Sequence, residues 1–393
     1  MPRWAQFAIF LGIGGAITGA VHAYLWARLV RDAQLPPIWH RVATAALILA
    51  WLSVPVGLGF GRALAAAGHR TVVLALTSWL GFMLLLLVSV AVGELARLGA
   101  HGAVALGLSP PLDPERRLTL ARIAALGAVL FGGGAGVAGV VGGLSRVIVR
   151  EVEVRLRRLP RRLDGTTIVQ LTDVHVGPTI RRDFVADVVA RVNALEPDVI
   201  AITGDLVDGT VAELREHVEP LGRLRARHGV YFVTGNHEYY SGVDAWIEEL
   251  ARLGIRVLRN ERVAIGDGAE SFDLAGVDDA SARRFGRGHG LDLERALAGR
   301  DPSRECVLLA HQPKGFEAAA EAGIGLQLSG HTHGGQIWPW GWLVRIDQRW
   351  VSGLASLRDA QLYVSSGTGY WGPPMRLGAP AEITRVRLVS APG

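Results

Sequence analysis

The hydrophobic pattern divides the chain into two halves. Long apolar runs dominate residues 1–148, and shorter apolar runs separated by polar motifs fill the remainder. A membrane-crossing helix needs ~20 apolar residues, and the long runs that approach this length cover residues 7–30, 42–61, 72–95 and 119–145. A buried helical bundle of a soluble protein is the alternative. Arginines at the ends of four successive runs favour a membrane domain of four transmembrane helices over residues 1–148.

The second half alternates short apolar runs with polar motifs and amphipathic stretches. Runs such as 167–171, 198–202 and 307–310 are bounded by polar residues and glycine and predict buried strands. Residues 183–195 carry apolar side chains at helical spacing. After residue 255 the pattern becomes strand-rich. We therefore expect a linker and first strand over residues 149–165, then an α/β catalytic domain over 166–393 with two mixed β-sheets packed face to face and helices outside.

Composition agrees with this division. Half of the residues are hydrophobic, and the mean hydropathy of +0.28 is high for a purely soluble protein. The net charge of +5 is carried almost wholly by arginine, without an aromatic and basic stripe, so nucleic acid is not an expected partner. Cys306 is the only cysteine, which excludes an intrachain disulfide. The lipid bilayer is an expected partner, and no obligate protein partner is evident.

The arginines give two readings of the membrane orientation. The loops after the first and third predicted helices hold more arginines than the N-terminus and the loop after the second, which places the catalytic domain outside the cytoplasm by the positive-inside rule. Seven arginines over residues 146–162 favour the opposite side. Glu115–Leu120 resembles a twin-arginine export signal. We expect a multi-pass protein of a bacterial inner membrane, with its first helix retained and an extracytoplasmic catalytic domain.

Five polar motifs follow the predicted strands of the second half in a fixed order. They are Asp173-Val-His175, Gly204-Asp205-Leu-Val-Asp208, Gly235-Asn236-His237-Glu238, His311 and Gly330-His331-Thr-His333. Side chains two apart in an extended segment point the same way, so the Asp-x-His and His-x-His pairs can each grip a metal ion. A mixture of carboxylate, amide and imidazole ligands without thiolates suits Mn, Fe or Zn.

These motifs predict a centre of two divalent metal ions. The expected ligands are Asp173, His175, Asp205, Asn236, His311, His331 and His333. Two ions ~3.5–4 Å apart can acidify a bridging water and neutralise charge on a phosphoryl group. Asp205 could bridge both ions, and His237 is placed to hydrogen-bond a substrate oxygen or to protonate the leaving group. We expect Asp208 and Glu238 to support the ligands. A single Asp-x-His after a strand is common and Gly-Asn-His alone is a plausible turn, so the prediction rests on all five motifs in order.

Residues 166–390 resemble the calcineurin-like metallophosphoesterase superfamily on these motifs. The strings Gly330–Gln336 and Ser365–Gly378 are similar to its branch of transmembrane proteins with a metallophosphoesterase domain. The resemblance implies an αββα sandwich with His237 as the catalytic histidine. It also implies one ion held by Asp173, His175, Asp205 and His333, and another held by Asp205, Asn236, His311 and His331. It does not cover the membrane half.

Aromatic residues and one arginine lie near the last motifs. Tyr370, Trp371 and Arg376 are expected at the substrate entrance, because arginine suits bidentate phosphate contact, although a purely structural loop is the alternative. Four tryptophans surround the last metal motif and could either dip into the membrane interface or cover the core. They are Trp338, Trp340, Trp342 and Trp350.

Together these features predict a membrane-anchored, metal-dependent hydrolase of phosphoric esters or pyrophosphates that acts through a metal-bridged hydroxide. The anchor favours a phosphate-ester substrate at the bilayer, and the resemblance ranks lipid-linked pyrophosphates such as UDP-2,3-diacylglucosamine first. The alternatives are a nuclease or nucleotide phosphodiesterase with the same metals, and a membrane sensor or scaffold whose hydrolase domain only binds. A zinc hydrolase of the metallo-β-lactamase type is excluded, because His331-Thr-His333 is followed by two glycines.

Overall fold

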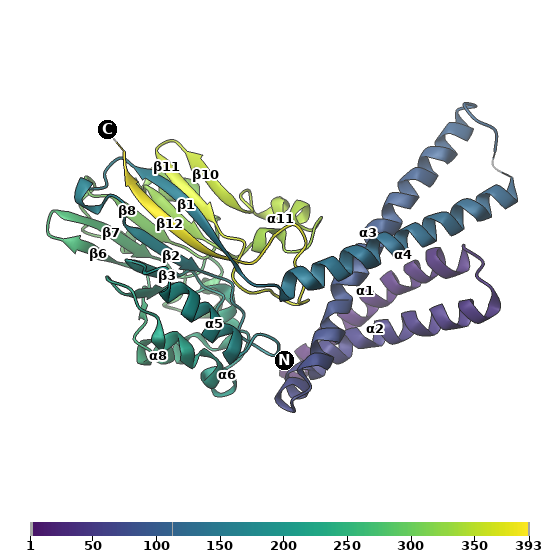
Figure 1. The fold of residues 1–393 in the computed structure, drawn as a ribbon, viewed down its shortest axis with the longest axis horizontal. Coiled ribbons are helices and arrows are strands. Elements are labelled where there is room, and N and C mark those ends of the chain that lie inside the picture. Colours follow the sequence, from purple (N-terminus) through teal and green to yellow (C-terminus); the bar gives the residue numbers. More distant parts are fainter. Residues whose placement is uncertain (1–2, 112, 392–393) are drawn as a thin grey trace. The chain divides into compact units, whose positions relative to one another are not determined.

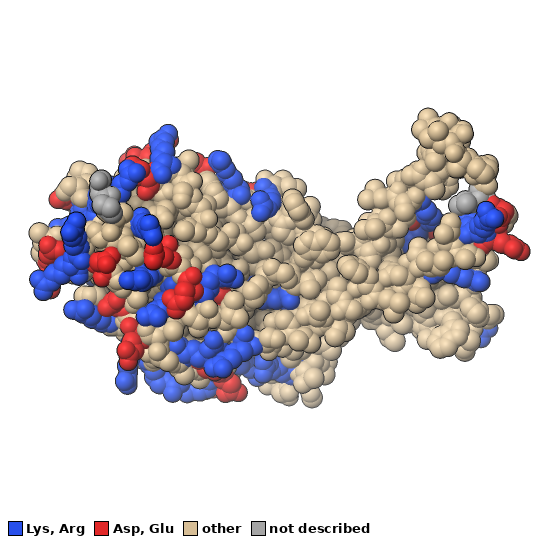
Figure 2. Space-filling view, turned by 45° about the horizontal axis from the view of Figure 1, so that its top comes forward, with Lys and Arg blue, Asp and Glu red and all other residues tan. Residues whose placement is uncertain are grey.

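The protein is described by a computed structural model that covers residues 3–111 and 113–391 (Figure 1). Contacts along the chain divide it into two compact units. The helical unit comprises Met1–Leu144 together with Gly372–Met375, and the catalytic unit comprises Ser145–Trp371 together with Arg376–Gly393. Figure 2 shows charged side chains scattered over the catalytic unit, whereas long stretches of the helical unit are free of charge on the visible face.

The helical unit is built from long helices that follow one another through short turns. They are α1 (Arg3–Trp26) with the π-helical turn η1 (Ala27–Arg31), α2 (Pro37–Ala66), α3 (Arg70–Ala105) and α4 (Pro114–Leu144). Gly132 of α4 lies directly against the backbone of Leu86 in α3, where a Cβ atom would come within 3.1 Å of the Leu86 Cα. Small residues therefore bring these two helices close together, as is usual for helices packed in lipid.

Three helices of the described residues are long and apolar enough to cross a membrane, namely α2, α3 and α4. The predicted count of four spans exceeds by one the count found among the described residues. The remaining run does fold as α1, but part of this helix lies outside the residues whose side chains the structure describes. Only 6% of the apolar window of α2 is buried. Such a surface is suited to lipid rather than water, so the helical unit indicates association with a membrane.

The catalytic unit contains two mixed sheets, each of six strands in the described part of the chain. The first sheet has the order β1 (Ile148–Leu156), β12 (Glu382–Ser390), β2 (Thr167–Leu171), β3 (Val199–Ile202), β4 (Val230–Phe232) and β5 (Arg256–Val257). The second has the order β10 (Gly353–Leu357), β11 (Ala360–Val364), β9 (Leu326–Ser329), β8 (Cys306–Leu309), β7 (Glu270–Gly276) and β6 (Glu261–Asp267). This arrangement confirms the predicted α/β class.

The two sheets share one apolar core. Ile168 and Val199 of the first sheet pack in the same cluster as Phe272, Val307 and Leu326 of the second. Because successive side chains of a strand point to opposite faces, the other face of each sheet needs its own cover.

Helices supply that cover (Figure 1). Buried residues of α5 (Arg182–Asn193), α6 (Val211–Val218) and α8 (Val243–Arg252) share a cluster with strands of the first sheet. Residues of α9 (Leu293–Ala296) and α10 (Phe316–Glu321) do the same on the second. The shorter elements are η2 (Arg161–Leu163), η3 (Glu219–Arg223), α7 (Asn236–Ser241), η4 (Ala282–Phe285), η5 (His333–Gly335) and α11 (Gly341–Asp347).

Parallel pairing brings the polar motifs to one edge of the sandwich. β2, β3 and β4 are parallel neighbours, and so are β8 and β9. Each of these strands ends two to four residues before a predicted ligand, as Leu171 before Asp173 and Leu309 before His311. The carboxyl ends of parallel strands lie at the same sheet edge, so the loops that follow them can meet.

Candidate metal centre

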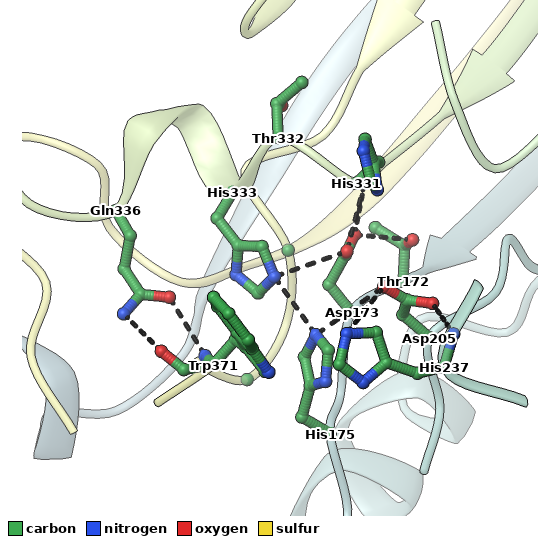
Figure 3. Close-up of polar contacts among 12 residues, drawn as sticks. Thr172, Asp173, His175, Asp205, His237, His331, Thr332, His333, Gln336 and Trp371 are labelled. Atoms are coloured by element: carbon green, nitrogen blue, oxygen red, sulfur yellow. Dashed lines mark hydrogen bonds and ion pairs between the residues drawn. The ribbon is translucent and has the colours of Figure 1, made fainter. Parts of the chain in front are cut away.

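The loops after the five strands converge although they lie far apart in sequence (Figure 3). The backbone amide of His331 donates to both carboxylate oxygens of Asp173, at 3.0 and 2.9 Å, across 158 positions of the chain. The backbone amide of His237 donates to Asp205 Oδ1 at 2.9 Å. Backbone groups of one motif therefore hold the carboxylates of another, which fixes where these acidic side chains point.

Side chains of the motifs form groups that could hold a metal ion. Asp173, His175 and His333 form one, and Asp205, His311 and His331 form another, with ligand atoms within 4.8 Å of one another in each. Both groups are subsets of the two ligand sets implied by the resemblance. Asp205 Oδ2 lies 3.1 Å from His311 Nε2 and 3.9 Å from His175 Nε2. This carboxylate therefore lies between the two groups.

The hydrogen bond behind His311 determines which of its ring nitrogens can bind a cation. His311 Nδ1 lies 2.8 Å from the carbonyl oxygen of Thr203, which can only accept, so Nδ1 carries the proton. The neutral ring then has its lone pair on Nε2. This atom faces Asp205 Oδ2 at 3.1 Å and His331 Nδ1 at 3.2 Å. A divalent cation bound between these atoms would stabilise a carboxylate and imidazole nitrogens that point toward one another.

His175 repeats this arrangement on the other side. Its Nδ1 lies 3.1 Å from Asp208 Oδ1, and its Nε2 lies 3.1 Å from His333 Nε2. The side-chain oxygen of Asn236 is buried and has no hydrogen-bond partner in the described residues. An unpaired buried amide oxygen costs roughly 1–3 kcal/mol, and a metal ion at this position would remove that cost. The donor set therefore fits divalent metal ions, as the sequence predicted.

The ligand loops adopt an uncommon backbone conformation. Non-glycine residues rarely have a positive φ, and each such residue costs about 1–3 kcal/mol when the surroundings impose it. Five of the seven predicted ligands have one: Asp173 (52°), His175 (55°), Asp205 (50°), His331 (70°) and His333 (51°). The strain is concentrated in the residues whose side chains converge, which marks this region as a functional site.

His237 lies beside the two ligand groups and is held by Asp208. Its Nδ1 lies 2.6 Å from Asp208 Oδ1, and its Nε2 lies 3.9 Å from Asp205 Oδ2. Burial lowers the pKa of His237, but the hydrogen bond that its ring donates to Asp208 and the charge of Asp205 outweigh this effect and raise the pKa to about 9. Burial would raise the pKa of Asp208, yet His175 and His237 hold it well below its usual value. Asp208 thus links two imidazoles, a contact that the spacing of the motif did not reveal.

Glu238 connects two of the motif loops. It is almost fully buried and accepts hydrogen bonds from the backbone amides of Gly235 (2.7 Å), Asp205 (3.0 Å) and Leu206 (2.8 Å). Backbone hydrogen bonds to a carboxylate are strong because the acceptor is charged. This geometry agrees with the supporting position predicted for Glu238. The hydrogen bonds connect the loop after β3 to the loop after β4 and so fix their relative positions.

Aromatic rings border His237 on the accessible side of the centre. The rings of Tyr240 and Trp371 meet the His237 ring edge-on, with centroids 5.4 and 5.8 Å away, and both are more than half exposed. Gln336 holds Trp371 through its side-chain amide, which donates to the Trp371 carbonyl and accepts from its backbone amide, each at 2.9 Å. Sequence reasoning missed Tyr240 and Gln336. Tyr240 was within reach of prediction, because it follows His237 by three residues on one helix.

Arg376 and Tyr370 are placed differently from Trp371. Arg376 is only 3% exposed, and its guanidinium donates to backbone carbonyls of Gly369 (2.8 Å) and Ala379 (2.9 Å), with His333 at 3.3 Å. Burial lowers the pKa of Arg376 to about 10, against the opposing charge of Asp173. Tyr370 is buried in the core beside the first sheet. The structure therefore favours the alternative of a structural loop for these two residues.

Gly235 allows the loops to interleave, and its replacement should disturb the centre. A Cβ atom at Gly235 would overlap Asp205 Oδ1 and the Asp205 backbone amide. We expect Gly235→Ala to cost about 1–3 kcal/mol through overpacking and to lower metal content, measured by melting temperature and elemental analysis. Gly341→Ala is the matched control, because its Cβ would meet only ordinary contacts at 3.7 Å. Unchanged metal content in Gly235→Ala would contradict this view of the loops.

The Arg376→Gln variant distinguishes a structural role of this arginine in its loop from a role as a substrate contact. If the guanidinium holds the loop, several buried carbonyls lose their donor at a cost of roughly 1–3 kcal/mol each. We therefore expect a clearly lower melting temperature, whereas Arg358→Gln at an exposed position should change it little. A melting temperature equal to wild type combined with a raised KM would instead identify Arg376 as a substrate contact.

Known proteins share these features. Residues 166–335 match the family model described as calcineurin-like phosphoesterase. The chain is 32% identical over 388 residues to an uncharacterized metallophosphoesterase of Campylobacter jejuni, covering 97% of this chain and 98% of that protein.

Two further relatives match the second half of the chain. The transmembrane protein with metallophosphoesterase domain of Bos taurus is 46% identical over 267 residues, covering 65% of this chain and 60% of that protein. An uncharacterized metallophosphoesterase of Helicobacter pylori is 41% identical over 249 residues, covering 63% and 65%. The match thus spans under two thirds of these two relatives. The family model and the nearly full-length match to the Campylobacter jejuni protein confirm the resemblance: the chain belongs to the calcineurin-like phosphoesterase family.

Proposed function

We propose that this chain is a membrane-anchored phosphoesterase that hydrolyses phosphodiester or pyrophosphate bonds with two divalent metal ions. The observation that carries the proposal is the convergence of acceptor atoms around Asp205. His311 Nε2 and His331 Nδ1 lie on one side of this carboxylate, and His175 Nε2 lies on the other. Two groups of ligand atoms that share a carboxylate between them support a binuclear centre over a single site.

The ligand groups support a particular assignment of ligands to each of the two metal ions. Asp173, His175, Asp205 and His333 would hold one ion, and Asp205, Asn236, His311 and His331 would hold the other. Oxygen and imidazole ligands without thiolate suit Mn, Fe or Zn. When bound, the ions supply an acidified water and positive charge against a phosphoryl group.

The remaining residues position the substrate and move a proton. Asp208 accepts from His237 Nδ1 at 2.6 Å, which leaves Nε2 directed toward the ligand groups. From there Nε2 can donate a hydrogen bond to a phosphoryl oxygen or a proton to the leaving oxygen. Trp371 and Tyr240 border this imidazole and would contact the part of the substrate beyond the phosphate. Glu238 keeps the loops rigid through its three backbone hydrogen bonds.

The membrane helices support a substrate at the bilayer surface. Three helices are long and apolar enough to cross a membrane, so a lipid-linked phosphate would lie in the same bilayer as the proposed anchor. Pyrophosphates of the UDP-2,3-diacylglucosamine type are the first compounds to test. They would be reached from the cytoplasm, whereas phospholipids or cell-wall phosphodiesters would be reached from outside, so the membrane side decides between them.

We place the chain in a bacterial inner membrane, with the catalytic unit on the extracytoplasmic side. The arginines in the loops after the first and third predicted helices and the segment Glu115–Leu120 support this orientation. We expect protease added to intact spheroplasts to digest residues 166–393, because the catalytic unit would be accessible from outside. Digestion that requires lysis of the spheroplasts would place the catalytic unit in the cytoplasm and reverse the orientation.

The metal centre and the catalytic histidine can be tested separately. Wild-type protein should contain two metal ions per chain and hydrolyse bis-p-nitrophenyl phosphate. His237→Ala should keep both ions and lose about 10²–10⁴-fold in kcat, which is the usual contribution of a proton donor. Asp205→Asn should lose metal and activity together, because this carboxylate lies between both ligand groups. His228→Ala, in the turn before β4, should match wild type.

Other outcomes would redirect the proposal. Loss of metal in His237→Ala would make this residue a ligand. Metal-loaded wild-type protein that turns over no phosphate ester would favour a sensor or scaffold that only binds. A panel of nucleotides, oligonucleotides and lipid phosphates then identifies the substrate class, and preference for oligonucleotides would support the nuclease alternative.

A further inference from the structure

The segment that follows the last metal motif exposes large apolar side chains. Its helix α11 has no buried residue, although even a short helix normally buries one face. Trp342 is 69% exposed and Ile346 is 82% exposed. We name this surface the tryptophan lip and define it as Trp338, Trp340, Trp342, Leu343 and Ile346, all between 47% and 82% exposed. Contiguous exposed apolar surface of this kind marks an interaction site.

The segment that carries the tryptophan lip contacts the ligand loop at two places. Where it begins, Gly335 packs so closely on Gly341, the first residue of α11, that a Cβ atom would overlap it. Where it ends, the side chain of Thr332 donates to the carbonyl of Val351 at 2.6 Å. Thr332 lies between the predicted ligands His331 and His333. Whatever holds the lip therefore also positions this part of the candidate metal centre.

The chemistry of the lip matches the headgroup region of a bilayer better than a protein core. Tryptophan is enriched at membrane interfaces because its ring is apolar and its indole N–H is polar. Cationic side chains lie next to the lip: the Arg345 guanidinium lies 5.9 Å from the Trp342 ring centroid. The Arg349 guanidinium lies 5.0 Å from the Trp350 ring centroid and is also paired with Glu317 at 3.2 Å. Arginine can bind the phosphates of lipids while tryptophan contacts the adjoining acyl chains.

The chain itself keeps a membrane within reach of the catalytic unit. α4, a candidate span, ends at Leu144, and β1 begins at Ile148. Three residues lie between them, and three extended residues cover at most about 10 Å. The start of the catalytic unit is therefore tied close to the end of a membrane helix, which favours a bilayer as the occupant of an apolar surface on this unit.

We propose that the tryptophan lip inserts into the headgroup region of the same bilayer that holds the membrane helices. The insertion fixes the height of the His331–His333 loop above the membrane, so that the candidate metal centre faces phosphates at the lipid surface. This inference concerns the docking surface and does not require the hydrolytic reaction.

A spin label at residue 346 tests the insertion in the full chain. Cys306 is fully buried, so wild-type protein should take up no label and Ile346→Cys should take up one. After reconstitution into vesicles of phosphatidylglycerol and phosphatidylcholine, collisions of the label with oxygen are compared with those with a water-soluble nickel chelate. Oxygen concentrates in the bilayer, so we expect oxygen collisions to dominate at residue 346.

Arg227→Cys is the matched control for the label. Its side chain is 76% exposed, and it precedes β4, so it lies at the strand end opposite to the one that carries the ligand loops. We expect nickel collisions to dominate there. A second label at Trp342→Cys should agree with residue 346, because both belong to the lip.

Two results would overturn the proposal. Dominant nickel collisions at residues 346 and 342, as at the control, would show that the lip remains in water. Protection of both labels from oxygen and nickel alike would show that the lip is covered by protein, either the helical unit or a second copy of the chain. Neither result depends on catalytic activity, so the proposed reaction stands or falls separately.

Discussion

The close approach of buried carboxylate and imidazole groups is the constraint on which this structure depends. Five loops bring carboxylate oxygens and imidazole nitrogens to within about 3–4 Å of one another, centred on Asp205. Hydrogen bonds from behind, as from His311 Nδ1 to the Thr203 carbonyl, direct the lone pairs inward. Such an arrangement is costly in a buried site unless cations compensate it. The fold therefore provides groups of side chains that could hold metal ions.

The surrounding structure exists largely to impose that arrangement. Positive φ angles at five predicted ligands would relax if the loops were free. Glu238 prevents this by accepting from three backbone amides of two loops, and Gly235 lets those loops approach without a clash. Beneath them, two sheets with a common core deliver their parallel strand ends to one edge. Rigid strands position the loops, and the loops position the ligands.

Membrane attachment and the candidate chemistry are linked through short stretches of chain. Three residues join α4 to β1. The segment that carries the tryptophan lip contacts the ligand loop at Gly335 and again at Thr332. This segment is held by close packing at Gly335 and by the hydrogen bond of Thr332. The apolar composition that marks the first half as a membrane domain thus has a counterpart in exposed tryptophans within the catalytic half.

The sequence by itself determined the α/β class and the strand that precedes each motif, and it predicted the types of the candidate ligand residues, because hydrophobic periodicity and residue spacing are local properties. It also indicated that Glu238 supports the ligands. Only the tertiary structure decided that Asp208 joins His175 to His237 and that Arg376 binds backbone carbonyls. These contacts join segments tens to hundreds of residues apart or depend on how a loop folds back on itself. Which donor meets which acceptor is therefore a property of packing, which no local pattern encodes.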